Sequence, residues 1–294
     1  MPEWQGKSRG NALGYRIFVA VCKTAGLTPA YFLLRFVALY YFLFSFKSSA
    51  PIYRYFVKRH SRSKIAALGS LYKNYYRFGQ TLLDKIVVMA GIENRFTYHF
   101  DGEQNLMEIV QQRKGGILLS GHVGNWEVAG YFLQRLNTTI HVVMFDGEHE
   151  QIKRYLSTVT GERAFNVIVV REDMSHVYAI GEALQKNQLV CMHADRFVEK
   201  NKTGTRSFLG APALFPMGPF ALAAGFKVPV SIVFAFKETN RHYHFFGSKP
   251  IVRDEQESKQ QYTDRLMGRF VQEMEEKVRM YPEQWFNYYN FWTE

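Results

Sequence analysis

The amino-acid sequence predicts an α/β fold, with a largely parallel central sheet flanked by helices and a hydrophobic, basic helical region ahead of it. Short continuous apolar runs, typical of strands buried in a parallel sheet, recur along the chain after residue 96. Stretches with helical spacing separate most of these runs, and such alternation is typical of α/β folds. Before residue 96 the apolar residues follow helical spacing. We therefore expect a basic helical region at residues 1–95 and a single α/β unit at residues 96–294.

The N-terminal region combines an apolar segment with the positive charge of the chain. Residues 30–46 carry Arg35 as their only charge, and a helix of this length reaches about 25 Å, just short of the ~30 Å hydrocarbon core of a bilayer. Residues 1–95 hold fifteen Lys and Arg but three Asp and Glu, whereas the whole chain has a formal net charge of +11. We expect this region to anchor in the membrane, either as a single span or as a helix that lies at the anionic surface, where each basic residue adds about 1 kcal/mol.

Two other interpretations of this region stay open at this stage. One is a buried core helix followed by a solvated basic face. The other is a nucleic-acid surface, because basic residues interleaved with aromatic ones bind phosphates and stack on bases. No recognition motif accompanies these residues, so we expect no nucleic-acid partner. The N-terminal residues also lack the pattern of a cleavable secretory signal, and we expect none.

The other elements are predicted from apolar spacing and from the positions of Gly and Pro. Helices are expected at residues 63–89, 103–112, 150–159, 175–186 and 256–281, and strands at residues 117–120, 140–145, 167–170, 189–193 and 228–236. Residues 199–207 are expected to form a polar loop, and the Gly- and Pro-rich residues 208–225 to become helical. A hydrophobic content of 47% excludes a disordered chain, and the presence of Cys22 and Cys191 alone excludes a disulfide scaffold or a Cys-based zinc site.

The segment with the clearest chemistry is SGHVGNWE, which directly follows a predicted strand. A histidine at the carboxyl end of a buried strand lies where α/β folds place their sites. A tight turn through Gly121 and Gly124 brings Glu127 back toward His122, where a carboxylate fixes the tautomer and leaves the other ring nitrogen as a general base. Such a pair lacks its own nucleophile, so the attacking group comes from the substrate. The alternative is a structural histidine in a Gly-rich turn, with Asn125 capping the next helix.

Other chemistries fit less well. The chain has no G-x-S-x-G elbow, no H-E-x-x-H motif and no phosphate-binding glycine loop. His193 and Asp195 lie two residues apart and, with His122 and Glu127, have the residue types of a metal cluster, although such residues are more often substrate contacts. We therefore expect no metal ion and no cofactor.

Several motifs occur together in one order along nearly the whole chain. They are L-L-R-F-V-A-L-Y, F-G-Q-T-L-L-D-K, G-H-V-G-N-W-E, the Gly- and Pro-rich segment from Phe208 to Pro219, and Y-P-E-Q-W-F. The H-x4-E block resembles that of the lysophospholipid acyltransferase superfamily, and the ordered set resembles the late acyltransferases of lipid A biosynthesis, the lauroyl and myristoyl transferases of Gram-negative inner membranes. Where that family commonly has Pro-Asp-Gln, this sequence keeps the acid as Asp195 and replaces the Gln by Arg196.

The resemblance implies an acyltransferase on the cytoplasmic face of the inner membrane. The enzyme would move an acyl chain from an acyl carrier protein thioester, or from acyl-CoA, to a hydroxyl of a lipid A precursor or a similar membrane glycolipid, without a cofactor. His122 would be the general base and Glu127 its support. Implied partners are the acidic carrier protein, the lipid acceptor and the anionic membrane surface. Implied substrate-binding residues are Asn125, Arg154, Arg163, Asp195, Arg196, Gly210 and Gly218, the glycines through backbone N–H groups that stabilise an oxyanion.

Two alternatives remain within this resemblance. In the first, the protein is an acyltransferase for a different acceptor, such as an aminolipid, a lysophospholipid or an aryl-polyene-type lipid. In the second, it has the same fold but binds lipids without catalysis. The sequence does not distinguish among these acceptors, nor does it fix the length of the acyl chain.

Overall fold

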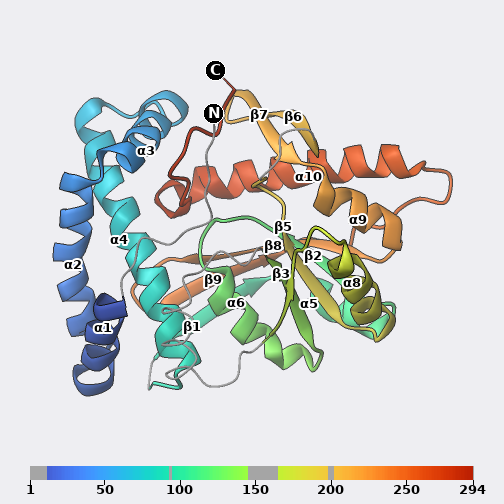
Figure 1. The fold of residues 1–294 in the computed structure, drawn as a ribbon, viewed down its shortest axis with the longest axis horizontal. Coiled ribbons are helices and arrows are strands. Elements are labelled where there is room, and N and C mark those ends of the chain that lie inside the picture. The colour runs from blue at the N-terminus through green and yellow to red at the C-terminus, as the bar shows by residue number, and fades with distance from the viewer. Residues whose placement is uncertain (1–11, 93–94, 145–164, 198–201, 294) are drawn as a thin grey trace. The chain divides into compact units, whose positions relative to one another are not determined.

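The computed structural model describes residues 12–92, 95–144, 165–197 and 202–293 (Figure 1). These residues form two compact units. The first contains the N-terminal helices up to Phe96 together with the segment Tyr281–Phe291, and the second contains the other described residues from Thr97 onward. The division of function at residue 95 stays a prediction.

Helices make up the first unit. They are α1 (Ala12–Ala25), α2 (Leu27–Phe44), α3 (Phe46–Arg59) and α4 (Lys64–Met89). The short 3-10 helix η3 (Pro282–Gln284), from near the C-terminus, also belongs to this unit. The apolar segment 30–46 is interrupted, because α2 ends at Phe44 and α3 begins at Phe46. The helix expected at residues 63–89 is confirmed as α4, whose N-terminal N–H of Ala66 is capped by the Ser63 hydroxyl.

One face of α2 packs against α4 and forms the core of this unit. Its buried residues are Leu27, Ala30, Tyr31, Leu34 and Ala38, and the first four of these cluster with Leu83 and Val87 of α4. The two helices approach closely, since a Cβ at Gly79 of α4 would lie 2.4 Å from a methyl carbon of Leu34. The Tyr31 hydroxyl donates a hydrogen bond to the buried carboxylate of Asp84, which removes the cost of an unpaired acid in this core.

The opposite face of α2 is apolar and exposed. Its outward side chains are spaced by three or four residues and include Phe32, Phe36, Leu39, Tyr40 and Leu43. Among the described residues, α2 is the helix long and apolar enough to cross a membrane by length and composition. An exposed apolar face of this length in contact with water is unusual for a soluble monomer.

A seven-stranded sheet forms the centre of the second unit, with strand order β1-β9-β8-β2-β5-β3-β4. Its strands are β1 (Thr97–Asp101), β2 (Gly116–Ser120), β3 (Ile140–Met144), β4 (Asn166–Val169), β5 (Leu189–His193), β8 (Val230–Lys237) and β9 (His242–Gly247). All neighbouring strands run parallel except β8 and β9. The predicted fold class, a largely parallel sheet flanked by helices, is confirmed.

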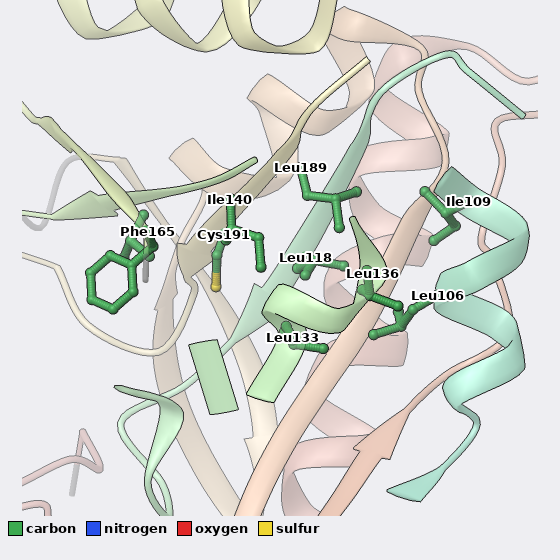
Figure 2. Close-up of a cluster of buried hydrophobic side chains, with 10 residues drawn as sticks. Leu106, Ile109, Leu118, Leu133, Leu136, Ile140, Phe165, Leu189 and Cys191 are labelled. Carbon is green, nitrogen blue, oxygen red and sulfur yellow. The ribbon is translucent and has the colours of Figure 1, made fainter. Parts of the chain in front are cut away.

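Helices cover both faces of this sheet. On one face lie α5 (Glu103–Gln111), α6 (Trp126–Phe132) and the 3-10 helix η1 (Leu133–Leu136). Buried side chains of α5 and η1 meet those of the strands in the cluster of Figure 2, and Trp126 of α6 packs against it. On the other face α10 (Lys259–Met280) packs beside α9 (Gly218–Phe226), and Phe270 of α10 contacts Phe234 of β8. Beside α9 lies α8 (Ser175–Gln185), where Gly181 makes room for Phe226.

Most expected elements of this unit are confirmed, but one is wrong. Residues 199–207 were expected to form a polar loop, whereas β6 (Thr203–Phe208) pairs antiparallel with β7 (Ala211–Pro216). The polar residues of β6 lie in a two-stranded ladder, so backbone pairing outweighs the polar composition. The strands β1 and β9 were not expected from the sequence, and the helix expected at residues 150–159 lies outside the described residues.

Candidate active site

The candidate site lies where two neighbouring parallel strands end. In the register of β2 and β5, Ser120 is opposite His193. The backbone N–H of Ala194 continues the ladder to the Ser120 carbonyl at 2.8 Å. The residues that follow both strands, His122 and Asp195, therefore emerge at the same carboxyl edge of the sheet, which is the edge that α/β folds use for their sites.

His122 is held by Asp195 through two contacts. Nδ1 of His122 lies 2.8 Å from Oδ1 of Asp195, and the backbone N–H of His122 donates to Oδ2 at 2.9 Å. The Asp195 side chain is 1% exposed and that of His122 26% exposed. When Nδ1–H donates to the carboxylate, Nε2 carries the lone pair of the imidazole, whose side chain is partly exposed.

The protonation of this pair follows from its surroundings. Burial and the nearby Arg196 cation lower the pKa of His122 below its ordinary value of 6.5, although Asp195 acts in the opposite direction. Burial alone would raise the pKa of Asp195, but His122 and Arg196 hold that pKa far below its ordinary 3.8. At neutral pH the pair is a neutral imidazole beside an ionised carboxylate, which is the state that a general base requires.

A second imidazole lies against the first. The ring of His193 is 4.4 Å from that of His122 and 4.9 Å from that of Trp126, measured between centroids. Burial and the neighbouring His122 lower the pKa of His193 to about 3. Neither ring nitrogen of His193 has a hydrogen-bond partner among the described residues. A buried polar group of this kind is costly to leave unpaired, which suggests that a substrate atom pairs with it.

The turn after His122 has a backbone that depends on glycine. Gly124 has a φ of 64°, and a Cβ there would lie 1.9 Å from the Ala235 carbonyl oxygen. The next N–H, that of Asn125, donates to the same oxygen at 2.7 Å. The buried Asn125 side chain accepts from the N–H of Val128, so it caps α6, and it donates to the Tyr243 hydroxyl. This turn fixes the loop between β2 and α6 and so the direction of His122.

An apolar pocket lies between the sheet and α6. Its wall includes Leu118, Ser120, Trp126, Ala129, Leu133 and Cys191. Ser120 is two residues from His122, and Trp126 contacts His193, so the wall of the pocket is continuous with the polar site. The volume of the pocket is about 30 Å³, so a hydrocarbon chain enters this apolar space only when the lining side chains move apart.

The structure brings together some of the residues predicted from the sequence. Asp195, which was expected to contact substrate, lies at Nδ1 of His122. Glu127 was the residue expected to support this imidazole. Glu127 is half-buried in the first turn of α6, and Arg196 is close enough to affect His122. The roles assigned to these residues stay predictions.

The other predicted substrate contacts are more widely spread. Gly210 lies in the turn of the β6–β7 hairpin, and Gly218 is the first residue of α9. Arg154 and Arg163 lie outside the described residues. Asn125 caps a helix, as the alternative interpretation expected, and its contact with substrate stays a prediction.

The metal cluster considered from the sequence also has a structural counterpart. His122, His193 and Asp195 each offer one ligand atom, and the three atoms lie within 4.8 Å of one another. The hydrogen bond between His122 and Asp195 explains why these two side chains lie close together without an ion between them. The expected absence of a metal stays a prediction.

Fold and site together define an α/β enzyme with its polar residues at the carboxyl edge of a parallel sheet. The profile of the bacterial lipid A biosynthesis acyltransferase family matches residues 71–293. The chain therefore belongs to the bacterial lipid A biosynthesis acyltransferase family.

Individual relatives are more distant. The phosphatidylinositol mannoside acyltransferases of two Mycobacterium tuberculosis strains, ATCC 25618 / H37Rv and CDC 1551 / Oshkosh, are each 28% identical over 111 residues. That match covers 37% of this chain and spans 34% of the length of each relative. Among solved structures, the 1-acyl-sn-glycerophosphate acyltransferase of Thermotoga maritima is 14% identical, with a TM-score of 0.36 over 83% of this chain and 97% of that one.

Proposed function

We propose that the protein transfers an acyl chain from a thioester, carried by acyl carrier protein, to a hydroxyl of a lipid A precursor or a similar membrane glycolipid. The observation that carries this proposal is the His122 imidazole beside an apolar pocket, kept neutral by burial and Arg196 and oriented by the buried Asp195. Acyl-CoA is the alternative donor, because both donors present the same thioester to the site.

His122 acts as the general base in this proposal. Nε2 takes the proton of the acceptor hydroxyl while its oxygen attacks the thioester carbonyl, and a tetrahedral intermediate forms. The intermediate collapses as the carbon–sulfur bond breaks, and the imidazolium gives its proton to the leaving thiolate. The negative charge of Asp195 stabilises the imidazolium between these steps, and a positioned base of this kind contributes about 10²–10⁴-fold in rate.

The oxyanion of the intermediate needs hydrogen-bond donors. A neutral imidazole donates one N–H, and the neutral His193 beside His122 supplies such a donor in this proposal. Arg196 supplies positive charge next to the same group. Glu127, on the first turn of α6, remains the second acid of the site, and its role is tested separately below.

The thioester chain lies in the apolar pocket between the sheet and α6. A chain that widens this pocket passes Trp126, which lines it and contacts His193, and the thioester carbonyl then lies beside the two imidazoles. The pocket wall therefore limits the length of chain that fits. The lipid acceptor approaches from the exposed side of His122.

The first unit holds the enzyme at the membrane in this proposal. The exposed face of α2 enters the interface, while its buried face stays packed on α4, so α2 lies at the bilayer surface and does not span it. The basic residues of the N-terminal region favour anionic lipid headgroups. Phe36→Asp on this face should abolish co-sedimentation with anionic vesicles, whereas the control Tyr178→Asp, at an exposed site on α8, should bind as the unaltered protein does.

The experiment that tests the activity is an acyl-transfer assay with the purified full chain and a Gram-negative lipid extract. Lauroyl, myristoyl and palmitoyl thioesters of acyl carrier protein and of CoA are offered in parallel, and the lipid products are identified by mass spectrometry. We expect one acyl chain added to one glycolipid, with acyl carrier protein as the better donor. Acylation of an aminolipid or lysophospholipid instead would change the acceptor, and no acylation with any donor would favour a lipid-binding protein without catalysis.

A further inference from the structure

A second cluster of metal-ligating side chains lies on β1 and β9, outside the proposed active site. His99 and His244 are opposite each other in the parallel register of these strands, and Asp101 follows two residues after His99. One donor atom from each of the three side chains lies within 4.8 Å of the others. The residue types, two imidazoles and one carboxylate, are those that bind zinc and similar divalent ions.

The donor atoms converge on one carboxylate. Nε2 of His99 lies 2.9 Å from Oδ1 of Asp101, and Nε2 of His244 lies 2.9 Å from Oδ2. Zinc bonds of about 2.0–2.2 Å in tetrahedral geometry place neighbouring ligand atoms about 3.3 Å apart. The two N–O contacts are within a few tenths of an ångström of that spacing, and rotation of the exposed side chains would direct one atom of each residue to a common ion. The exposed His99 and Asp101, at 63% and 57% of their side-chain areas, leave an open path for an ion.

His244 carries the strongest argument for a cation. A carboxylate oxygen faces each of its ring nitrogens, Asp101 at Nε2 and Glu238 at Nδ1, the latter at 3.1 Å. A neutral imidazole has one donor and one acceptor nitrogen, so one of these contacts would place a lone pair against a carboxylate. The arrangement is favourable only with a second positive centre on the ring, which is either a proton or a metal ion at Nε2.

The contact with Glu238 favours the metal. Histidines that bind a metal through one nitrogen usually donate the other N–H to a carboxylate, which fixes the ring and strengthens the ligand. Glu238 has this position at Nδ1 of His244. We propose that His99, Asp101 and His244 form a binding site for a divalent transition metal ion such as zinc, with Glu238 as the positioning residue for His244. Asp101 and His244 are 143 residues apart in sequence, so the ion would tie the edge strand β1 to β9.

The test is calorimetric titration of zinc into the full chain, purified without a histidine tag and stripped with a chelator. Three proteins are compared with the unaltered one: the double variant His99→Gln with His244→Gln, the single variant Glu238→Gln, and His122→Ala as a control that removes the other His–Asp cluster. We expect one site with a dissociation constant in the micromolar range or below. This site should vanish in the double variant, weaken about 10–100-fold in Glu238→Gln, and persist in His122→Ala.

Thermal unfolding gives the second measurement. Zinc should raise the melting temperature of the unaltered protein and of His122→Ala, but not that of the double variant, because an ion that binds the folded state alone stabilises it. Equal zinc binding by the double variant and the unaltered protein would overturn the proposal. Loss of binding in His122→Ala alone would assign the ion to the active-site cluster. Should the double variant fail to fold, unchanged affinity in Glu238→Gln would overturn it instead.

Discussion

Two clusters of the second unit contain the same residue types, two histidines and one aspartate, in different surroundings. In the buried cluster Asp195 contacts Nδ1 of His122, and the ring nitrogens of the neighbouring His193 have no hydrogen-bond partner among the described residues. In the exposed cluster Asp101 contacts both imidazoles, and Glu238 occupies the remaining nitrogen of His244. The composition is the same, but Asp195 contacts His122 at Nδ1, whereas carboxylates face both ring nitrogens of His244.

Burial and the number of carboxylates account for this difference. Burial and Arg196 keep His122 neutral, and the carboxylate of Asp195 at Nδ1 orients its ring. Two carboxylates around His244 require a cation on its ring. A His–Asp cluster is therefore a candidate base where it is buried with one acid, and a candidate cation site where it is exposed with two. The predictions below separate the two clusters.

The largest effect is expected from loss of the buried imidazole. His122→Ala should lower kcat/KM for acyl transfer by about 10²–10⁴-fold, because the acceptor hydroxyl loses its base. The matched double variant in the exposed cluster, His99→Gln with His244→Gln, should retain kcat/KM within about twofold. Steady-state kinetics with one thioester donor measures both, and equal losses in the two proteins would show that the clusters do not differ in function.

The pocket beside the buried cluster is expected to set the acyl chain length. Ala129 lines the pocket together with Leu133 and Trp126, and the larger side chain in Ala129→Phe occupies part of its space. The preferred donor should become shorter, with about tenfold or greater loss of kcat/KM for the longest chain accepted, since one methylene in an apolar pocket changes discrimination about 10–200-fold. Competition among thioesters of different lengths measures the change. An unaltered length profile would place the chain elsewhere.

The pH dependence of acyl transfer is expected to follow His122. The base works when neutral, so the rate should fall as the pH drops through its pKa, which lies below 6.5 because of burial and Arg196. Arg196→Gln removes a positive charge that opposes protonation, so the acid limb should move upward by about one pH unit, the scale of a nearby charge at an effective dielectric constant near 20. Arg196→Lys keeps the charge and is the control. A downward shift in Arg196→Gln would contradict this electrostatic role.

The smallest effect concerns the turn that supports the buried cluster. Asn125→Ala removes the cap of α6, and the free energy of unfolding should fall by about 0.5–2 kcal/mol. Urea denaturation measures this loss, and Asn125→Asp, which keeps a capping oxygen, should recover most of it. If Asn125→Ala unfolds like the unaltered protein but loses activity, Asn125 acts on the substrate as predicted from the sequence.

Much of the fold could be predicted because apolar runs identify buried strands. The runs at residues 117–120 and 189–193 are β2 and β5, and the alternation around them gave the fold class. Strands β1 and β9 were not predicted because histidine and acidic residues alternate with aromatic ones in them, so they contain no continuous apolar run. The hairpin at Thr203–Phe208 escaped because its partner strand, which satisfies its backbone, is not visible in a local pattern.

The candidate site was predicted in part. His122 was identified from the turn that follows a strand, and Asp195 was marked as a site residue, but their contact depends on β2 and β5 being neighbours. Strand order is set by long-range packing and is not encoded in the spacing within one segment. Asp195 reaches His122 from just after β5, 73 residues away in sequence, and the pairing of Glu127 with His122 stays a prediction. The two-residue spacing of His193 and Asp195 was the available signal.

The most direct measurement of the proposed mechanism is kcat/KM for acyl transfer by the unaltered protein, Asp195→Asn and Glu127→Gln, side by side. An asparagine offers one acceptor oxygen where Asp195 accepts both the backbone N–H and the imidazole N–H of His122. We expect Asp195→Asn to lose about 10²-fold or more while its fold, followed by circular dichroism, stays intact. Near-normal kcat/KM in Asp195→Asn together with an inactive Glu127→Gln would contradict the proposal and assign the support of His122 to Glu127.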